Sequence, residues 1–404
     1  MTQPLVLSAF TATTALGVGN APLLAALQGG TSGLKPCDFE TARIATWIGE
    51  VPGLDGVQLP HELAAYDCRN NRLALLGLLA DGFGQAARAA IARHGADRVA
   101  LILGTSTSGI LSAEAAYRER DADGALPAWF DYRATHNTGA LVSFVRDGLG
   151  LRGPAFTIST ACSSSAKAFA AADRMISAGL ADAAIVGGVD SLCLTTLYGF
   201  SSLELTSPEP CRPGDAHRQG LSIGEAAAFA LLERADAAPA QPGPRIVLAG
   251  WGESSDAHHM SAPHPDGRGA RAAMVQALQR AALSPHDIGY INLHGTATPA
   301  NDLSEGRGVA AVFADHPDVP SSSTKGMMGH TLGAAGAVEA VVSALALQHG
   351  LLPASVGLQT PDPAIPLNIV SVPQRLPSLR HVLSNSFGFG GSNASLVLSR
   401  REVA

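Results

Sequence analysis

One cysteine and two histidines lie where the sequence pattern predicts the ends of strands and the starts of helices. Cys162 lies in "ISTACSSSAKAFA", just before an Ala-rich helical pattern. A free cysteine is ordinarily a buried structural residue. A helix N-terminus, however, lowers the pKa of a thiol, and the backbone N–H there can face a developing oxyanion. We therefore predict that Cys162 is a nucleophile and that the other four cysteines are structural: Cys37, Cys68, Cys193 and Cys211.

The histidines belong to two separate segments. His294 follows a β-branched run in "YINLHGTATPANDLSE", and His330 lies at a glycine-rich helix start in "SSTKGMMGHTLGAAG". Either one alone would most often be a structural loop histidine. Together with a cysteine at a helix start they form the set that nucleophilic thiol catalysis requires.

The segment "SNSFGFGGSNASLVL" places Phe387 and Phe389 between glycines and serines. It is either a tight turn before a final strand or a flexible loop with exposed N–H groups and an aromatic gate. The G-x-G-x-x-G spacing of a dinucleotide site is missing.

The histidine-rich run "DAHHMSAPHPDG" contains His258, His259 and His264. It lacks the spacing of metal ligands on a helix, and two prolines interrupt it. We predict no metal site there.

These candidate residues need a scaffold of alternating strands and helices. Short β-branched runs at 99–106 and 183–191 predict buried strands, and Ala-rich runs at 72–95 and 165–179 predict helices that end at glycine. The alternation predicts an α/β fold in which mostly parallel strands are covered by helices.

The scaffold is predicted to have two similar halves. An Ala/Pro/Gly-rich connection lies within 233–250, and a new strand pattern follows it. A Ser-Thr pair precedes both Cys162 and Lys325, and an Ala-rich helix follows in each case. We therefore place one half at 1–245 and the other at 246–404, each directing a helix N-terminus to a shared site.

Composition limits the class of protein. Of 404 residues, 46% are hydrophobic and 15% are charged, which is typical of a well-buried globular protein. The net charge of -7 and the lack of a Lys/Arg-rich run argue against nucleic acid. Five cysteines without paired spacing favour reduced thiols in the cytoplasm. We see no signal peptide pattern and no apolar run of about 18 residues, so we expect no membrane association.

Four segments together resemble the elongating β-ketoacyl-acyl carrier protein synthases of the thiolase-like superfamily: "TACSSSAKA", "NLHGTATPANDLSE", "SSTKGMMGHTLGAAGAVEA" and "SNSFGFGGSNASLVL". The resemblance implies a five-layered αβαβα fold made of two related halves. It also implies a decarboxylative Claisen condensation between an acyl thioester and a malonyl thioester on acyl carrier protein.

The resemblance implies a role for each matching residue. Cys162 would carry the acyl group, while His294 and His330 would promote decarboxylation and stabilise the enolate oxygen. The backbone N–H groups of Cys162 and Phe389 would form the oxyanion hole, and the Phe389 ring would gate the acyl pocket. Two imidazole donors in a dry site suit this chemistry without a metal.

The resemblance further implies an ion pair between Lys325 and Glu339 that maintains the architecture of the site. The other supporting residues would be Asp302, Glu305, Phe387 and Asn385. No organic cofactor is expected, although the family pattern allows a structural monovalent cation near Glu339 and Asn385.

The chain departs from the family pattern in "CRPGDAHRQGLSIGEAAAF", where Gly214, Gln219 and Leu221 replace an aromatic residue, an acid and a phenylalanine. These differences suit a specialised aryl polyene or type II polyketide ketosynthase that works with a chain-length factor, as an alternative to housekeeping fatty-acid elongation. Thr107 falls at a position that varies near the acyl pocket of relatives.

Acidic carrier protein should meet basic residues near the entrance. Arg212 matches a family docking position, and Arg69 and Arg72 are further candidates, although solvated surface arginine is the ordinary interpretation. Family members are dimers, so we expect a homodimer or a heterodimer with a chain-length factor. The segment 129–148 is the candidate contact.

Two other functions compete with the synthase. A non-catalytic chain-length partner would lack the nucleophile, and an acyl transferase that does not condense would not need both histidines. The presence of Cys162, His294 and His330 argues against both, and activity with malonyl carrier protein separates the three.

Overall fold

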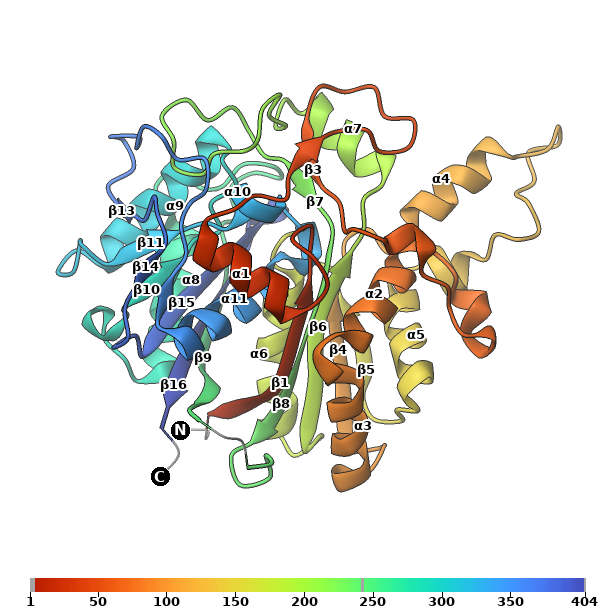
Figure 1. Cartoon of the computed structure of the whole chain (residues 1–404), viewed down its shortest axis with the longest axis horizontal. Helices are drawn as coiled ribbons and strands as arrows, with labels where there is room; N and C mark the ends of the chain where they lie inside the picture. The colour runs from red at the N-terminus through yellow and green to blue at the C-terminus, as the bar shows by residue number, and fades with distance from the viewer. Residues whose placement is uncertain (1–3, 241–242, 403–404) are drawn as a thin grey trace.

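A computed structural model describes residues 4–240 and 243–402. Eleven strands form its main sheet, in the order β13-β11-β10-β15-β16-β9-β1-β8-β6-β4-β5 (Figure 1). The strands of the first half are β1 (Leu5–Thr13), β4 (Val99–Gly104), β5 (Ala155–Ile158), β6 (Ala183–Asp190) and β8 (Ala226–Arg234). Those of the second half are β9 (Arg245–Ser255), β10 (Tyr290–Asn292), β11 (Pro320–Ser322), β15 (His381–Gly388) and β16 (Ser392–Arg401), with β13 (Asn368–Ile369) at the edge.

The two halves repeat one topology. Numbered within its own half, each set of five strands has the order 3-2-4-5-1. Strands 2, 3 and 4 are parallel, and strand 5 runs antiparallel to strands 4 and 1 in both halves. A short β1–β9 pairing, Leu5 with Leu248 and Val6 with Val247, joins the two sets.

Two helices form the central layer between the halves. They are α6 (Ser164–Ser177) and α11 (Ala335–His349), and each contacts strands of both halves. Small residues allow the close approach, since a Cβ at Gly336 would lie 2.6 Å from the Cβ of Ala166. The segment Leu332–His349 is long and apolar enough to span a membrane, but 89% of it is buried inside the protein, as in the core helix of a globular fold.

Further helices complete the five layers. One outer layer contains α2 (Arg69–Leu79), α3 (Phe83–His94) and α5 (Gly139–Leu149), and the other contains α8 (Arg268–Ala281) and α9 (Pro299–Val312). The remaining helices are α1 (Asn20–Gly29), α4 (Ile110–Arg118), α7 (Leu194–Ser202) and α10 (Lys325–Met328). Small strands are β2 (Lys35–Pro36), β3 (Trp47–Gly49), β7 (Ile223–Gly224), β12 (Leu351–Leu352) and β14 (Gln374–Arg375). The predicted α/β fold with five layers is confirmed.

The predicted single helix over 72–95 is wrong. Asp81 has φ 52° and Gly82 has φ 70°, so the chain turns between α2 and α3. The Asp81 carboxylate accepts hydrogen bonds from the Thr11 hydroxyl at 2.8 Å and from the Asn20 backbone N–H at 2.8 Å, which fixes the turn. Gly95 ends α3 with φ 92°, as expected.

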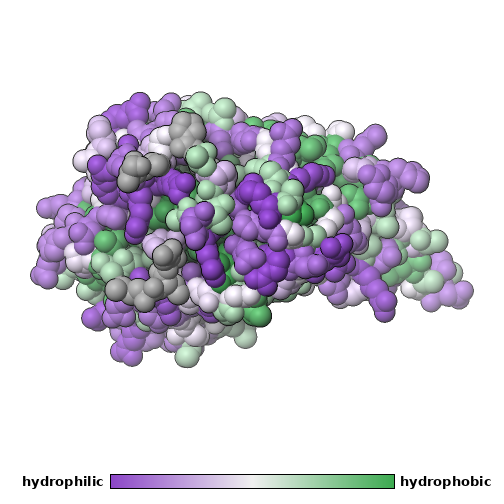
Figure 2. Space-filling view, turned by 90° about the horizontal axis from the view of Figure 1, so that it is seen from below, coloured by the Kyte–Doolittle hydropathy of each residue, from purple (hydrophilic) through white to green (hydrophobic). Residues whose placement is uncertain are grey.

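The connection predicted within 233–250 lies between β8 and β9, and residues 241–242 are outside the described part. Hydrophilic residues cover most of the face seen from below, with hydrophobic residues between them (Figure 2). On one side of the molecule, α4 and the segment that follows it extend away from the body (Figure 1).

Candidate active site

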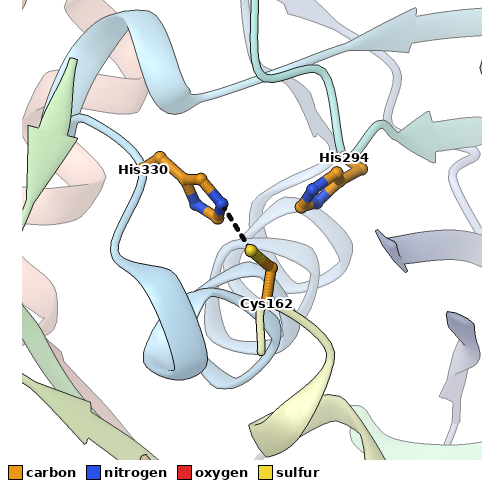
Figure 3. Close-up of side chains that lie close together, drawn as sticks. All are labelled: Cys162, His294 and His330. Carbon is orange, nitrogen blue, oxygen red and sulfur yellow. Dashed lines mark hydrogen bonds between the residues drawn. The ribbon is translucent and has the colours of Figure 1, made fainter. Parts of the chain in front are cut away.

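Cys162, His294 and His330 line one pocket, and their side chains point toward one another (Figure 3). Cys162 comes from the first half, and the two histidines come from loops of the second half. Their sulfur and nitrogen ligand atoms lie within 4.8 Å of one another, and all three side chains are buried. The sequence therefore predicted correctly that these three residues share one site.

Cys162 is fixed by the turn that leads into α6. Ala161 has φ 53°, a left-handed conformation that non-glycine residues rarely adopt. The Ser164 hydroxyl accepts a hydrogen bond from the Thr160 N–H at 2.9 Å and donates one to the Ala161 carbonyl. These local contacts direct the Cys162 side chain to the pocket.

The thiol of Cys162 does not have the lowered pKa that we predict from a helix start. Burial raises the pKa of Cys162 to about 12, although the Lys325 charge and the backbone N–H of Phe389 partly offset this effect. Desolvation of the thiolate therefore outweighs the favourable contacts in the site without substrate. Without substrate, the Cys162 thiol is therefore neutral near pH 7.

His330 is hydrogen-bonded to that thiol. Its Nε2 lies 3.0 Å from the Cys162 sulfur. Backbone contacts hold the residue against β7, because its N–H donates to the Ser222 carbonyl at 2.7 Å and its carbonyl accepts from the Gly224 N–H at 2.9 Å. A Cβ at Gly224 would lie 2.2 Å from the Met328 carbonyl oxygen, so only glycine permits this approach.

Both imidazoles are neutral near pH 7. Burial, and then the positive charge of Lys325, lowers the pKa of His294 and of His330 well below the usual value of 6.5. The two rings lie 5.2 Å apart at 84°, edge to face. A neutral imidazole can donate from one nitrogen and accept at the other, which proton transfer and oxyanion stabilisation both need.

Lys325 orients His294. Its ammonium donates hydrogen bonds to the His294 carbonyl and to Glu339, and it lies 3.5 Å from Nδ1 of His294. Because an ammonium group only donates, Nδ1 of His294 is the acceptor, and its Nε2 carries the hydrogen. The predicted Lys325–Glu339 ion pair is present and buried.

Glu305 and Asp302 support the same loop from α9. The two Glu305 oxygens accept from the N–H groups of His294 and Gly295, each at 2.8 Å. Burial raises the pKa of Glu305 to about 7. Asp302 accepts from the Ala297 N–H at 3.2 Å. Both carboxylates therefore fix the backbone around His294, as predicted.

The end of β15, which carries Phe387, and the turn after it, which begins with Phe389, close one side of the pocket. The Phe389 N–H hydrogen-bonds to Cys162, and a Cβ at Gly388 would lie 3.2 Å from the Cys162 nitrogen. The Phe387 ring lies 5.9 Å from the His294 ring. The Phe389 N–H therefore lies beside the thiol, while an oxyanion hole made with the Cys162 N–H stays a prediction.

The sequence did not reveal several residues of the pocket wall. The Phe200 ring on α7 lies 5.5 Å from the Phe389 ring. Other wall residues that we did not predict are Leu205, Asp256, Ser261, Ala262, Pro263, Thr296, Thr298, Ala300, Asn301, Gly391 and Asn393. Leu221, noted as a departure from the family, also lines the pocket. These residues are ordinary in type and come together only through tertiary packing.

Thr107 does not line the pocket that contains Cys162. Its hydroxyl lies 2.8 Å from the carboxylate of Asp190 and accepts from the Ser191 N–H at 3.1 Å. Its role in acyl binding stays a prediction.

The carrier-docking candidates lie in acidic surroundings. The prediction for Arg69 is wrong, because its side chain is only 8% exposed and binds Glu225 through two nitrogens at 2.6 and 2.8 Å. Arg72 pairs with Asp67 at 2.6 Å, and Arg212 pairs with a neighbouring glutamate at 2.8 Å. Docking through Arg72 or Arg212 stays a prediction.

The structure explains the missing aromatic residue at Gly214. This residue has φ 80°, and a Cβ there would lie 2.5 Å from Cδ1 of Ile369. Its N–H donates to Asp302 at 3.0 Å. Ile369 therefore fills the space beside a backbone conformation that favours glycine.

The residues near the suggested monovalent cation already have partners. Lys325 and the Ser386 hydroxyl contact Glu339, and Oδ1 of Asn385 accepts from the Ser395 hydroxyl at 2.8 Å. The Lys325 charge already balances the Glu339 carboxylate, so these side chains do not fit a cation site well. Asn385 also donates to Glu305 at 3.2 Å, which is a supporting role.

Comparison with known proteins points to one family. Residues 83–238 match the model of the β-ketoacyl synthase N-terminal domain, and residues 246–359 match that of the C-terminal domain. The 3-oxoacyl-[acyl-carrier-protein] synthase 2 of Rhizobium meliloti strain 1021 is 42% identical over 260 residues, which span 62% of each protein. The enzyme of the same name from Vibrio cholerae is 33% identical over 93% of this chain and 94% of its own length.

Comparison with solved structures points to the same family. A ketosynthase from Xenorhabdus doucetiae, determined in complex with its chain length factor, superposes with a TM-score of 0.86 at 40% identity over 98% of both chains. With the repeated topology and the Cys–His–His pocket, these similarities show that the chain belongs to the β-ketoacyl synthase family.

Proposed function

We propose that this protein is a β-ketoacyl-acyl carrier protein synthase, which joins an acyl group on Cys162 to a two-carbon unit from malonyl carrier protein. The observation that carries the proposal is the convergence of one thiol and two neutral imidazoles in a single buried pocket. A cytoplasmic setting and the lack of an organic cofactor remain part of this proposal.

Acyl transfer comes first. The Cys162 sulfur attacks the carbonyl carbon of the acyl thioester while its proton passes to Nε2 of His330, 3.0 Å away. The oxyanion that forms faces the N–H groups of Cys162 and Phe389. The carrier thiol then leaves with the proton from His330, and the acyl group remains on sulfur.

Decarboxylation and condensation follow. When the bond to the malonyl carboxylate breaks, CO2 leaves and the electron pair forms an enolate. Nε2–H of His294 donates to the enolate oxygen, and His330 donates to it in the neutral tautomer that carries its hydrogen on Nε2. The enolate carbon attacks the acyl carbonyl, and the Cys162 sulfur leaves as a thiolate. One proton from solvent then restores the thiol, so the whole cycle consumes one proton.

The test uses purified protein with a panel of acyl carrier proteins that carry saturated, mono-unsaturated or polyene chains. Intact mass identifies the acyl group that adds to the enzyme, with Cys162→Ala as the control, and malonyl carrier protein is then added. The proposal predicts label on Cys162 and a product longer by two carbons. No label and no product with the whole panel would contradict it.

A second candidate is a specialised ketosynthase that works with a chain-length factor. The Xenorhabdus ketosynthase, 40% identical, was solved with such a partner. In this chain the region 117–132 carries Tyr117, Trp129 and Tyr132, with 57%, 53% and 55% of their surfaces exposed. Exposed aromatic residues on a projecting segment are typical of a protein interface.

Oligomeric state and substrate choice distinguish the two candidates. Mass photometry of the purified chain gives a dimer if it pairs with itself and a monomer if it needs another chain. Uptake of polyene chains alone would favour the specialised candidate, and uptake of saturated chains would favour a fatty-acid elongator.

A further inference from the structure

Asp190, at the end of β6, is a buried carboxylate that the proposed reaction leaves without a role. It is completely buried, and no cation pairs with it among residues 4–240 and 243–402. Its negative charge is instead compensated by hydrogen bonds from two segments that are distant in sequence.

The first segment is the loop after β4. One oxygen of Asp190 accepts from the hydroxyls of Thr105 and Thr107 at 2.7 and 2.8 Å, and from the N–H groups of Ser106 and Thr107 at 2.8 Å each. The Ser106 hydroxyl in turn lies 3.5 Å from the carbonyl of Ala161, the residue before Cys162.

The second segment is the turn after His330. The other oxygen of Asp190 accepts from the N–H of Gly333. A Cβ at Gly333 would lie 2.7 Å from that oxygen, so only glycine permits the contact. Leu332 has φ 51°, which shows that this turn departs from regular helix before α11 begins.

One carboxylate therefore joins the segment beside Cys162 to the segment that follows His330. The Asp190 charge also acts on the nucleophile, because it raises the pKa of the Cys162 thiol. Removal of the carboxylate should therefore have two consequences. Loss of the link should change the position of His330 relative to Cys162, and loss of the charge should lower the pKa of the Cys162 thiol.

We propose that Asp190 is a positioning residue that sets the approach of His330 to Cys162 and thereby the rate of acyl transfer. This inference rests on the proposed function. In Asp190→Asn, one side-chain atom becomes a donor, so either the Gly333 N–H or the loop of Thr105–Thr107 loses its acceptor. A displacement of about 1 Å at a reacting group can slow a reaction about 100-fold.

The experiment compares Asp190→Asn with a matched variant at the other end of the same strand pair. Glu233 on β8 pairs with the first residue of β6, is buried, and accepts from Arg93 and His94 at 2.8 Å each. Glu233→Gln thus removes a buried carboxylate charge far from the pocket. Thr107→Val removes one donor and keeps the Asp190 charge, which provides a milder variant.

Two rates are measured for each folded variant: single-turnover acylation by acyl carrier protein, and alkylation of Cys162 by iodoacetamide against pH. We expect Asp190→Asn to slow acylation between 10-fold and 100-fold, with an unchanged apparent affinity for the carrier. The alkylation profile should shift to lower pH, because one negative charge is lost. The other charged and titratable groups around the thiol stay in place: Lys325, Glu339, His294 and His330.

We expect Glu233→Gln to leave both rates unchanged per folded molecule and Thr107→Val to slow acylation several-fold. If Asp190→Asn acylates like the wild type, or loses activity only in proportion to its unfolded fraction with no shift in the alkylation profile, the inference is wrong. If the wild type itself takes no acyl group, the proposed function fails instead, and the alkylation profile still tests the effect of Asp190.

Discussion

The segment that holds Cys162 and the segment that holds His294 line the same pocket but are fixed by different kinds of contact. Around Cys162 the contacts are short and mostly uncharged: the Ser164 hydroxyl closes the turn, and Ala161 is left-handed at φ 53°. The Ser164 hydroxyl thus hydrogen-bonds both the Thr160 N–H and the Ala161 carbonyl.

Around His294 the contacts are made by buried charged side chains. Lys325 lies between Glu339 and the His294 carbonyl, and Glu305 accepts from two N–H groups of the same loop. The Lys325 charge also helps to keep both imidazoles neutral. Buried charges therefore control the protonation state of the two imidazoles. Local backbone geometry orients the neutral thiol of Cys162.

The largest loss of folding stability should come from breaking the buried ion pair beside His294. Lys325→Ala leaves Glu339 as a buried, unpaired charge, which typically costs about 3–5 kcal/mol of folding free energy. Urea denaturation measures the loss. Arg152→Ala, which breaks a fully exposed pair with Asp97, is the control and should change stability little. Equal small losses in both variants would show that the Lys325 pair does not hold the site.

A smaller loss of folding stability should follow a change in the turn that holds Cys162. Ser164→Ala leaves the part-buried Thr160 N–H without its partner, which costs at most the roughly 1–3 kcal/mol of a fully buried donor. Urea denaturation again gives the value, and Ser202→Ala, whose exposed hydroxyl bonds only the Gly199 carbonyl, is the control. A loss as large as that of Lys325→Ala would remove the contrast between the two sides.

The pH dependence of the thiol gives a third test. With the Cys162 pKa raised to about 12 by burial, the thiolate fraction should rise about tenfold per pH unit from about pH 7 to about pH 10. Alkylation by iodoacetamide, followed by intact mass, should therefore speed up throughout this range, with Cys162→Ala reporting the other thiols. A plateau near pH 8 would mean that the thiolate is far better stabilised than the described contacts allow.

The smallest effect concerns the strained residue before the nucleophile. Ala161→Gly removes the cost of a left-handed alanine, about 1–2 kcal/mol, but adds freedom to the unfolded chain worth about 0.4–1 kcal/mol. We expect a net gain in stability of about 0–1.6 kcal/mol and unchanged acylation of Cys162. Thermal unfolding would contradict this account if the variant melted well below the wild type.

Sequence reasoning recovered the parts of the site that are local in the chain. The helix after Cys162, the strands before Asp190 and His294, and the glycine-rich loop around Phe389 each carry their own pattern. The turn at Asp81 was missed because partners in β1 and α1 fix it. Local sequence cannot show such distant acceptors and donors.

The same reason explains the error at Arg69. Its partner Glu225 is distant in sequence, and it buries an arginine that sequence alone places on the surface. Phe200 was missed because an aromatic residue in an apolar helix is ordinary until packing places it against Phe389. Patterns within one segment were predictable, and the family resemblance brought Cys162, His294 and His330 together, whereas the contacts of Asp81, Arg69 and Phe200 required the fold.

We expect Cys162 to hold the acyl group and His294 to serve the later decarboxylation. The most direct test incubates His294→Ala with acyl carrier protein and malonyl carrier protein and follows the enzyme by intact mass. The account predicts that the variant takes the acyl group on Cys162 and keeps it, while the wild type turns over to the elongated product. Turnover by the variant, or failure of the variant to acylate while it remains folded, would contradict this division of roles.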